Sequence, residues 1–302
     1  MSKTHEEPAL KGMAYGNEAV GKNTYRVSEQ YVAEHVAPLV KAHRVDAAKL
    51  DLILRGIALS PEHAGKRRPG TVLRRRGRVD YAYLHDLVRD PRRFSISRPE
   101  DDDDDAAERE QKREWVREQL RVLERRQLLV RADTGEGPRQ ITMLCDLGTG
   151  DPFDDPGDKK NQRPYVTVFG GVVASSYFRD WGAPELAGYF CAMVADRYAR
   201  NAMHRKGVNV EVGGATWYRQ AEWFNNKNGY RPEGHVVLPF STKTIERGLE
   251  SMRKLGFVEG VRRRRSPDGD RFVHPRMIYT NRFSSAGATA EIIDMTSREK
   301  LA

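Results

Sequence analysis

The segment Ser241–Val258 constrains the fold of this chain more than any other part of its sequence. Its apolar residues recur at intervals of four, three and three, which predicts one buried stripe along a helix: Ile245, Leu249, Met252 and Leu255. Ser241 can cap the first turn, because its hydroxyl accepts a bond from an unpaired backbone N–H. Gly248, on the apolar side, allows a neighbouring helix to approach closely, and Gly256 is suited to the left-handed residue that ends a helix.

A basic hairpin is expected directly after this helix. Phe257 and Val258 begin a strand that runs into Arg262-Arg263-Arg264-Arg265, turns at Ser266–Asp270 and returns through Arg271 to Arg282. Four adjacent arginines repel one another, and a polyanion relieves that repulsion best. The hairpin therefore favours an anionic partner, although a basic surface hairpin without a ligand is the simpler alternative.

A helix, a glycine, an apolar pair and a basic hairpin in this order resemble the recognition helix and wing of winged-helix DNA-binding domains. The order Ser-x-x-Thr-Ile-x-Arg-Gly-Leu-x-x-Met-x-x-Leu-Gly-Phe is similar to that of many bacterial regulators and plasmid replication initiators. The resemblance covers the segment Ser241–Arg282 closely. It implies that the helix enters a major groove of double-stranded DNA while the hairpin contacts the backbone or the minor groove.

The resemblance also assigns roles to individual residues. Base contacts are expected from the N-terminal part of the helix, at Thr242, Lys243, Thr244 and Arg247, and Arg247 can form the bidentate bond to guanine that arginine favours. Contacts with the DNA backbone are expected from basic residues in three places: Arg253 on the helix; Arg262, Arg263, Arg264, Arg265 and Arg271 in the hairpin; and Arg74, Arg75 and Arg76 in an earlier loop.

The positive charge of the chain is concentrated in two stretches. The net charge is +9 over 302 residues, yet Lys66–Arg78 alone contains seven basic residues and no acidic one. Ser241–Arg282 contains eleven basic against five acidic residues. These stretches exceed the whole surplus, so the remainder of the chain is net negative. A polyanion is expected to bind at specific places rather than over the whole surface.

The helix pattern occurs a second time, 129 positions earlier. Ile245 then falls on Val116, Leu249 on Leu120 and Met252 on Leu123, and a turn with a returning strand follows in both copies. The match departs where Gly256 meets Gln127 and where the capping Ser241 meets Lys112. The earlier copy is interpreted as a degenerate winged helix that either contacts DNA or serves in dimerisation. Chance similarity between two amphipathic helices is the alternative.

The expected fold is α+β, with two winged-helix domains in tandem, of which the C-terminal one matches the pattern more closely. The predicted division is a polar N-terminal arm (1–44), the degenerate domain (45–147), a linker rich in Gly, Asp and Pro (148–164), the DNA-binding domain (165–282) and a C-terminal tail (283–302). Three further elements are expected along the chain: a short helix near Ser28–Ala42, one or two strands over Tyr165–Phe178 and a small helix over Thr216–Phe224.

Several other functions find little support in the residues. Gly16–Asn23 nearly matches a phosphate-binding loop but has Asn23 in place of the Ser or Thr that binds magnesium. The run Asp101–Asp105 lacks the spacing of metal ligands, and the two cysteines, Cys145 and Cys191, have no ligand partners nearby in sequence. We therefore expect no enzyme activity, no metal and no cofactor. With no membrane segment and only two cysteines, a cytoplasmic location is expected.

Three roles fit a DNA-binding chain of this length. The first is a sequence-specific transcriptional regulator, which is favoured because regulators are the larger class. The second is a plasmid or phage replication initiator that binds origin repeats. The third is an adaptor in which a winged helix contacts a protein partner. Homodimer formation remains open in all three.

Overall fold

The computed structural model describes residues 24–58, 71–72, 81–89, 104–132, 140–157, 162–173, 176–218, 238–263 and 276–283. Within these residues the chain has a mixed α+β fold with three small antiparallel sheets. The buried apolar side chains form one continuous cluster that extends through all three sheets. None of the helices in the described ranges combines the length and hydropathy needed to cross a membrane.

The first group of elements, here called the N-terminal unit, runs from α4 to β4. Its elements are α4 (Val45–Ala58), β2 (Thr71–Val72), α6 (Tyr81–Val88), α7 (Asp104–Arg125), β3 (Leu129–Ala132) and β4 (Gln140–Met143). The strands form a sheet of order β2-β4-β3, so the last strand lies in the middle. The stripe expected on α7 is buried, since Val116, Leu120 and Leu123 have no exposed surface.

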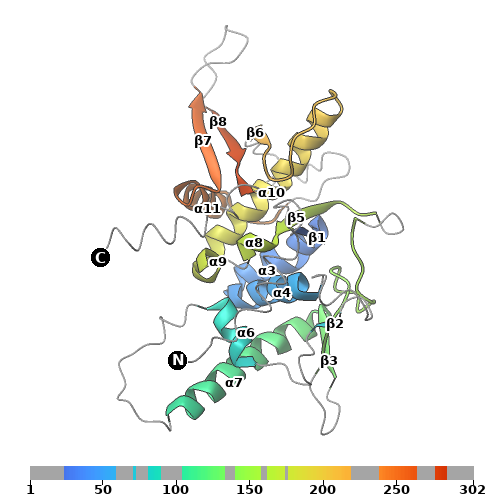
Figure 1. Cartoon of the computed structure of the whole chain (residues 1–302), viewed down its shortest axis with the longest axis vertical. Coiled ribbons are helices and arrows are strands. Elements are labelled where there is room, and N and C mark those ends of the chain that lie inside the picture. Colours follow the sequence, from blue (N-terminus) through green and yellow to red (C-terminus); the bar gives the residue numbers. More distant parts are fainter. Residues whose placement is uncertain are drawn as a thin grey trace.

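The C-terminal unit runs from α10 to β8. Its elements are α10 (Ala183–His204), β6 (Thr216–Tyr218), α11 (Thr242–Lys254), β7 (Val258–Arg263) and β8 (Arg276–Asn281). Its sheet has the order β6-β8-β7, again with the last strand in the middle. Figure 1 shows this hairpin and α11 in the upper part of the molecule and α7 near the opposite end.

The two units share their strand register. In the N-terminal sheet Thr142 of β4 lies opposite both Thr71 and Val130. In the C-terminal sheet Thr280 of β8 lies opposite Thr216 and Glu259, at the corresponding positions. Leu128 and Phe257, which follow the ends of α7 and α11, accept equivalent backbone bonds. Leu144 donates its N–H to the carbonyl of Leu128, and Arg282 donates its N–H to the carbonyl of Phe257, both at 2.9 Å. The similarity seen in the sequence thus extends to the backbone pairing.

The helices α7 and α11 also end in the same way. Gln127 and Gly256 both adopt a left-handed conformation, with φ of 55° and 75°. The next residue in each copy donates its N–H to a carbonyl five residues back, Leu128 to Leu123 at 3.2 Å and Phe257 to Met252 at 2.9 Å. Gln127 therefore takes the glycine position despite its side chain, and its mismatch in sequence does not change the geometry.

The first helices of the two units carry a matching ion pair that the sequence comparison missed. Asp51 accepts a bond from Arg55 at 2.8 Å on α4, and Asp196 accepts one from Arg200 at 2.7 Å on α10. Both carboxylates are completely buried. The two pairs are separated by 145 positions rather than 129, because the segment between the first helix and α7 differs in length from the one before α11.

A third, two-stranded sheet joins the units. β1 (Thr24–Ser28) pairs along its whole length with β5 (Tyr165–Phe169). After β1 the chain forms α2 (Glu29–Tyr31), a π-helical turn (Val32–Val36) and α3 (Ala37–Lys41), whereas α8 (Gly170–Val173) and α9 (Ser176–Asp180) follow β5. The buried Glu29 accepts bonds from Arg197 at 2.7 Å and from Tyr198 at 2.8 Å, both on α10. Buried charged contacts therefore hold α2 against the C-terminal unit.

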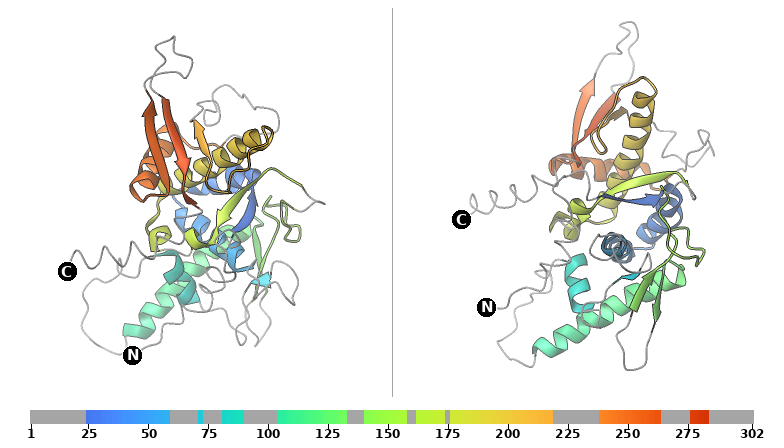
Figure 2. Two further views of the ribbon diagram at one scale, coloured as in Figure 1. Left: turned by 45° about the horizontal axis from the view of Figure 1, so that its top comes forward. Right: turned by 45° about the vertical axis from the view of Figure 1, so that its right-hand side comes forward.

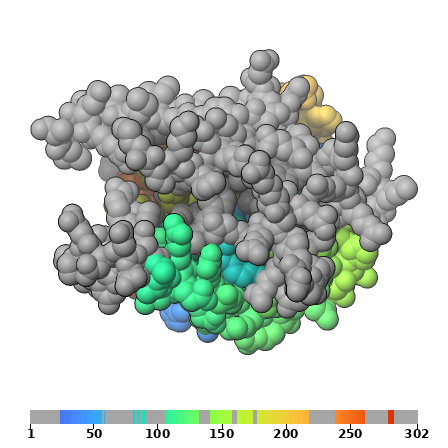
Figure 3. All heavy atoms as spheres, turned by 60° about the horizontal axis from the view of Figure 1, so that its bottom comes forward, coloured from blue at the N-terminus to red at the C-terminus, as the bar shows by residue number. Residues whose placement is uncertain are grey.

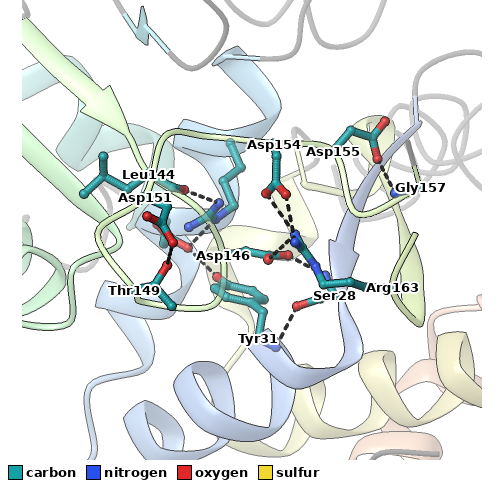
Figure 4. A network of polar contacts seen from close by, with 12 residues as sticks. Ser28, Tyr31, Leu144, Asp146, Thr149, Asp151, Asp154, Asp155, Gly157 and Arg163 are labelled. Atoms are coloured by element: carbon teal, nitrogen blue, oxygen red, sulfur yellow. Dashed lines mark hydrogen bonds and ion pairs between the residues drawn. The ribbon is translucent and has the colours of Figure 1, made fainter. Parts of the chain in front are cut away.

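The segment between β4 and β5 packs against the start of α2. Asp146 is buried and accepts the backbone N–H of Ser28 at 2.5 Å. Arg163 donates to Asp146 at 3.2 Å and to both oxygens of Asp154 at 2.8 Å, and Figure 4 shows its side chain between the two carboxylates. A segment expected to be a linker on its composition is thus held in place by its own ion pairs and by a bond to the end of β1.

Three expectations for local structure differ from the structure. The part 24–41 of the expected polar arm forms β1 and buried helices, because Tyr25, Val27 and Tyr31 enter the core. The strand expected to reach Phe178 ends at Phe169, since β1 provides pairing for only five residues. Thr216–Tyr218 is a strand rather than the start of a helix, because β8, distant in sequence, supplies its partner.

Candidate nucleic-acid interface

Helix α11 begins with the cap that the sequence predicts. The hydroxyl of Ser241 accepts the backbone N–H of Thr244 at 3.1 Å, and the two hydroxyls lie 2.6 Å apart. This bond fixes the first turn of the helix. The contact between the two hydroxyls also engages the side chain of Thr244, which is half-buried. Thr244 is therefore less accessible to a ligand than its neighbours Thr242 and Lys243.

The buried side of α11 lies directly against α10. Ile245, Leu249 and Met252 are buried, as expected from their spacing. At Gly248 the two backbones nearly touch, because an added Cβ would lie 1.8 Å from the carbonyl oxygen of Pro184 and 2.7 Å from the nitrogen of Gly188. Gly188 is equally constrained, since its Cβ would lie 2.4 Å from the carbonyl carbon of Gly248. The predicted close approach at Gly248 is confirmed, and it fixes which face of α11 points outward.

The outward face of α11 carries five charged residues, here called the α11 strip: Lys243, Glu246, Arg247, Glu250 and Arg253. All five are exposed. The first four follow the spacing i, i+3, i+4 and i+7, so they lie along one side of the helix. The structure therefore brings the predicted contacts Lys243, Arg247 and Arg253 together on one accessible surface.

The basic residues of this strip differ in their ion pairing. Arg253 donates through two nitrogens to Glu250, at 2.8 and 3.0 Å. The bond with Arg253 also holds the pKa of Glu250 below its usual value. In contrast, neither Lys243 nor Arg247 forms an ion pair with another described residue. On this strip, the cations without an ion pair to another described residue therefore lie in the N-terminal half of α11, the half that the sequence assigns to base contacts.

The hairpin β7–β8 continues from the end of α11. Arg262 lies opposite Met277 and Arg263 opposite Arg276, so the backbone of this arginine run forms part of the ladder. Arg264, Arg265 and Arg271 lie outside the described residues, as do Arg74, Arg75 and Arg76 of the earlier basic loop. The positions of these six predicted backbone contacts therefore stay predictions.

The corresponding face of α7, here called the α7 strip, carries the opposite charge at every position. Taken with an offset of 129, the five pairs are Glu114 and Lys243, Arg117 and Glu246, Glu118 and Arg247, Arg121 and Glu250, and Glu124 and Arg253. Glu114, Glu118 and Arg121 are exposed, and Arg117 and Glu124 are half-buried. The sequence comparison rested on the apolar residues and overlooked this reversal.

The α7 strip is also neutralised by its own ion pairs. Arg117 contacts Glu110 at 2.6 Å and Glu114 at 3.1 Å, while Arg121 contacts Glu114 at 3.1 Å. Glu118 accepts a bond from Arg44 at 2.6 Å. The face of α7 that corresponds to the outward face of α11 thus presents carboxylates and paired arginines, an unfavourable surface for a phosphate backbone.

One group of side chains in the described part of the chain has the composition of a metal site. Ligand atoms of Cys145, Asp146 and Asp154 lie within 4.8 Å of one another. However, Arg163 already bonds both carboxylates, and burial raises the pKa of the Cys145 thiol, which disfavours the thiolate that metals bind. The group is better explained as a salt-bridged support for the segment between the two units.

Comparisons of the chain with protein-family models, with curated proteins and with solved structures found no match. The functional interpretation therefore depends on the residues and on the geometry alone. The strongest contrast in that geometry is between α7 and α11, which have equivalent positions in their units and opposite charges on their outward faces.

Proposed function

We propose that the protein binds double-stranded DNA sequence-specifically through the C-terminal unit. In this proposal the unit is a winged helix, with α11 in the major groove and the β7–β8 hairpin against the backbone. The observation that carries the proposal is the exposure of Lys243 and Arg247 on a capped helix whose rotation is fixed by the contact between Gly248 and Gly188. A cationic helix face followed by a hairpin with adjacent arginines matches the charge of duplex DNA.

We further propose that the N-terminal unit is a second winged helix that does not read bases. The shared strand order and register of the two sheets support a tandem arrangement. The carboxylates of the α7 strip argue against base reading by this unit, since they lie where the DNA backbone would approach. The proposal thus places base recognition in a single helix of the chain.

The biological role that we propose is transcriptional regulation in the cytoplasm. The alternative, a plasmid or phage replication initiator, is favoured by one observation, the matching register of two units in a single chain. The two roles differ in the DNA that the protein selects. Repeated short sites within an origin support the initiator, and a single promoter site supports the regulator.

The proposal is tested by selecting duplexes from a random library with purified protein and then measuring affinity for the selected site. The variant K243A/R247A should lose the site preference, because it removes the two cations placed to meet base edges. The variant R205A/K206A is a matched control, since it removes two exposed positive charges just beyond α10, several helical turns from Gly188. Failure of the wild-type protein to bind any duplex at low salt would refute the proposal.

A further inference from the structure

We propose that the α7 strip of one molecule binds the α11 strip of a second copy of this chain. The two strips occupy equivalent positions on equivalent helices, and each of the five positions carries the opposite charge in the other strip. Two such faces are complementary when laid against each other in the register of the repeat. Charge complementarity of this kind determines the partner and the register of an association more than its strength.

The charge reversal also argues against contacts between two identical strips, α7 with α7 or α11 with α11, in the register of the repeat. Placed in the same register against a second α7, each residue of the α7 strip would meet its own charge, and the same holds for two α11 strips. Like charges directly opposite each other are unfavourable. In the register of the repeat, the complementary partner of the α7 strip is therefore an α11 strip.

The partner strip has to come from another molecule. Figures 1 and 2 show α7 and α11 in separate parts of the fold, with α3 and α4 between them. In Figure 3, which views the molecule from below, α7 lies at the surface that faces the viewer. A contact within one chain is thus ruled out by distance, and each molecule offers one strip of each kind.

The exposed charged groups of the strips can exchange partners on binding at little cost, whereas Glu124 is half-buried and keeps its bonds with Arg131. Glu250 with Arg253 is an exposed pair within α11, and Glu114 with Arg117 is a partly exposed pair within α7. Pairs of this kind contribute little to stability, because water competes for both charges. The contact between molecules has the same weakness, so it should form at low salt and weaken steeply as salt screens the charges.

This contact would regulate the proposed DNA-binding face. It joins two different surfaces, so it leaves one free α7 strip and one free α11 strip and can continue into an open chain of molecules. Every α11 strip within such a chain is covered, and DNA would compete for it. The competition rests on the proposed function, whereas the association of protein molecules does not.

Two charge-reversal variants test the association by sedimentation velocity at low salt. E114K/E118R makes the α7 strip basic, and K243E/R247E makes the α11 strip acidic. Each variant alone should associate about tenfold more weakly than the wild type, because one contact face is repelled. An equimolar mixture should associate again, since the basic α7 strip of the first variant meets the acidic α11 strip of the second. R205E/K206E is the control for the change of net charge in K243E/R247E, and circular dichroism verifies the folding of every variant.

The mixture decides the outcome. Restored association in the mixture supports the contact, and so does self-association of a third variant that carries all four substitutions, because its two strips are again complementary. Absence of wild-type association, or a mixture as weak as its components, would overturn the inference. DNA separates the two proposals: if the protein associates as expected but duplex DNA neither binds nor dissociates it, the proposed function fails while the contact between copies stands.

Discussion

The helices α7 and α11 have equivalent positions in two units of the same design, yet they differ in almost every exposed residue. Both bury an apolar stripe, both end in a left-handed residue, and both lead into a hairpin of the same register. On the outward face, glutamates replace the lysine and arginine of α11, and arginines replace its glutamates. The comparison shows that the buried face and the helix end specify the architecture, while the outward face is free to specify a different partner in each unit.

The largest expected effect tests how the two helices are packed. Gly248→Ala should reduce the free energy of unfolding by about 3 kcal/mol or more, because the new methyl group meets the backbone of α10, which cannot move aside easily. The equivalent residue of α7 is Gln119, which is buried but has a full side chain. Gln119→Ala should cost only about 1 kcal/mol by urea unfolding. Similar losses for both variants would mean that the glycine contact does not distinguish the units.

The next largest effect concerns the buried carboxylate of α10. Asp196 accepts the backbone N–H groups of Gly213 at 3.0 Å and Ala215 at 2.9 Å, in addition to its bond with Arg200. Asp196→Ala leaves these donors without their acceptor and should cost about 3 kcal/mol in unfolding experiments. Asp155→Ala, at an exposed ion pair with Arg26, is the control and should cost at most about 0.5 kcal/mol. A mild loss at Asp196 would indicate that water replaces the carboxylate.

A smaller effect tests the functional side of the comparison. Arg247→Ala should weaken binding to the preferred duplex by about 1–3 kcal/mol and relax its base preference, because in the proposed complex this arginine contacts a base edge. Its counterpart on α7 is Glu118, and Glu118→Ala should leave both affinity and preference nearly unchanged. Affinities measured by fluorescence anisotropy at one salt concentration separate the outcomes. Equal weakening of all sequences by Arg247→Ala would assign this residue to the backbone instead.

Much of the C-terminal unit could be predicted from the sequence, because its signals are local. The cap at Ser241, the apolar stripe and Gly256 all act within a few residues of one another, and the structure contains each of them. The helix expected near Ser28–Ala42 is present over residues 29–41, but the strand β1 and the burial of this segment could not be predicted in this way. No local pattern predicts the pairing of β1 with β5 or the bonds of Glu29 to α10, because each joins residues more than 130 positions apart.

The features of the candidate site can likewise be separated into those that the local sequence predicts and those that it does not. The exposure of Lys243 and Arg247 follows from helical periodicity once the apolar stripe is known. The pairing of Arg253 with Glu250 could have been suspected from their spacing, but the sequence alone does not show which of its neighbours Glu250 selects. The charge reversal on α7 was already readable from the sequence at an offset of 129. It becomes visible only when the charged positions of the two copies are aligned as well as the apolar ones.

The smallest predicted effect asks how far the helix ends are equivalent. Gln127 has φ of 55°, a conformation that costs a residue with a side chain about 1–2 kcal/mol, while glycine loses roughly 0.5–1 kcal/mol in chain entropy on folding. Gln127→Gly should therefore stabilise the protein by about 0.5 kcal/mol. Gly256→Ala should destabilise it by about 1 kcal/mol, through backbone strain alone, since an added Cβ there meets no atom within 4 Å. Opposite shifts of the urea midpoint in the two variants would show that both ends obey one backbone rule. A loss of stability in Gln127→Gly would instead show that the Gln127 side chain, which lies near Gly150, supports the segment between the units, a role that Gly256 cannot share.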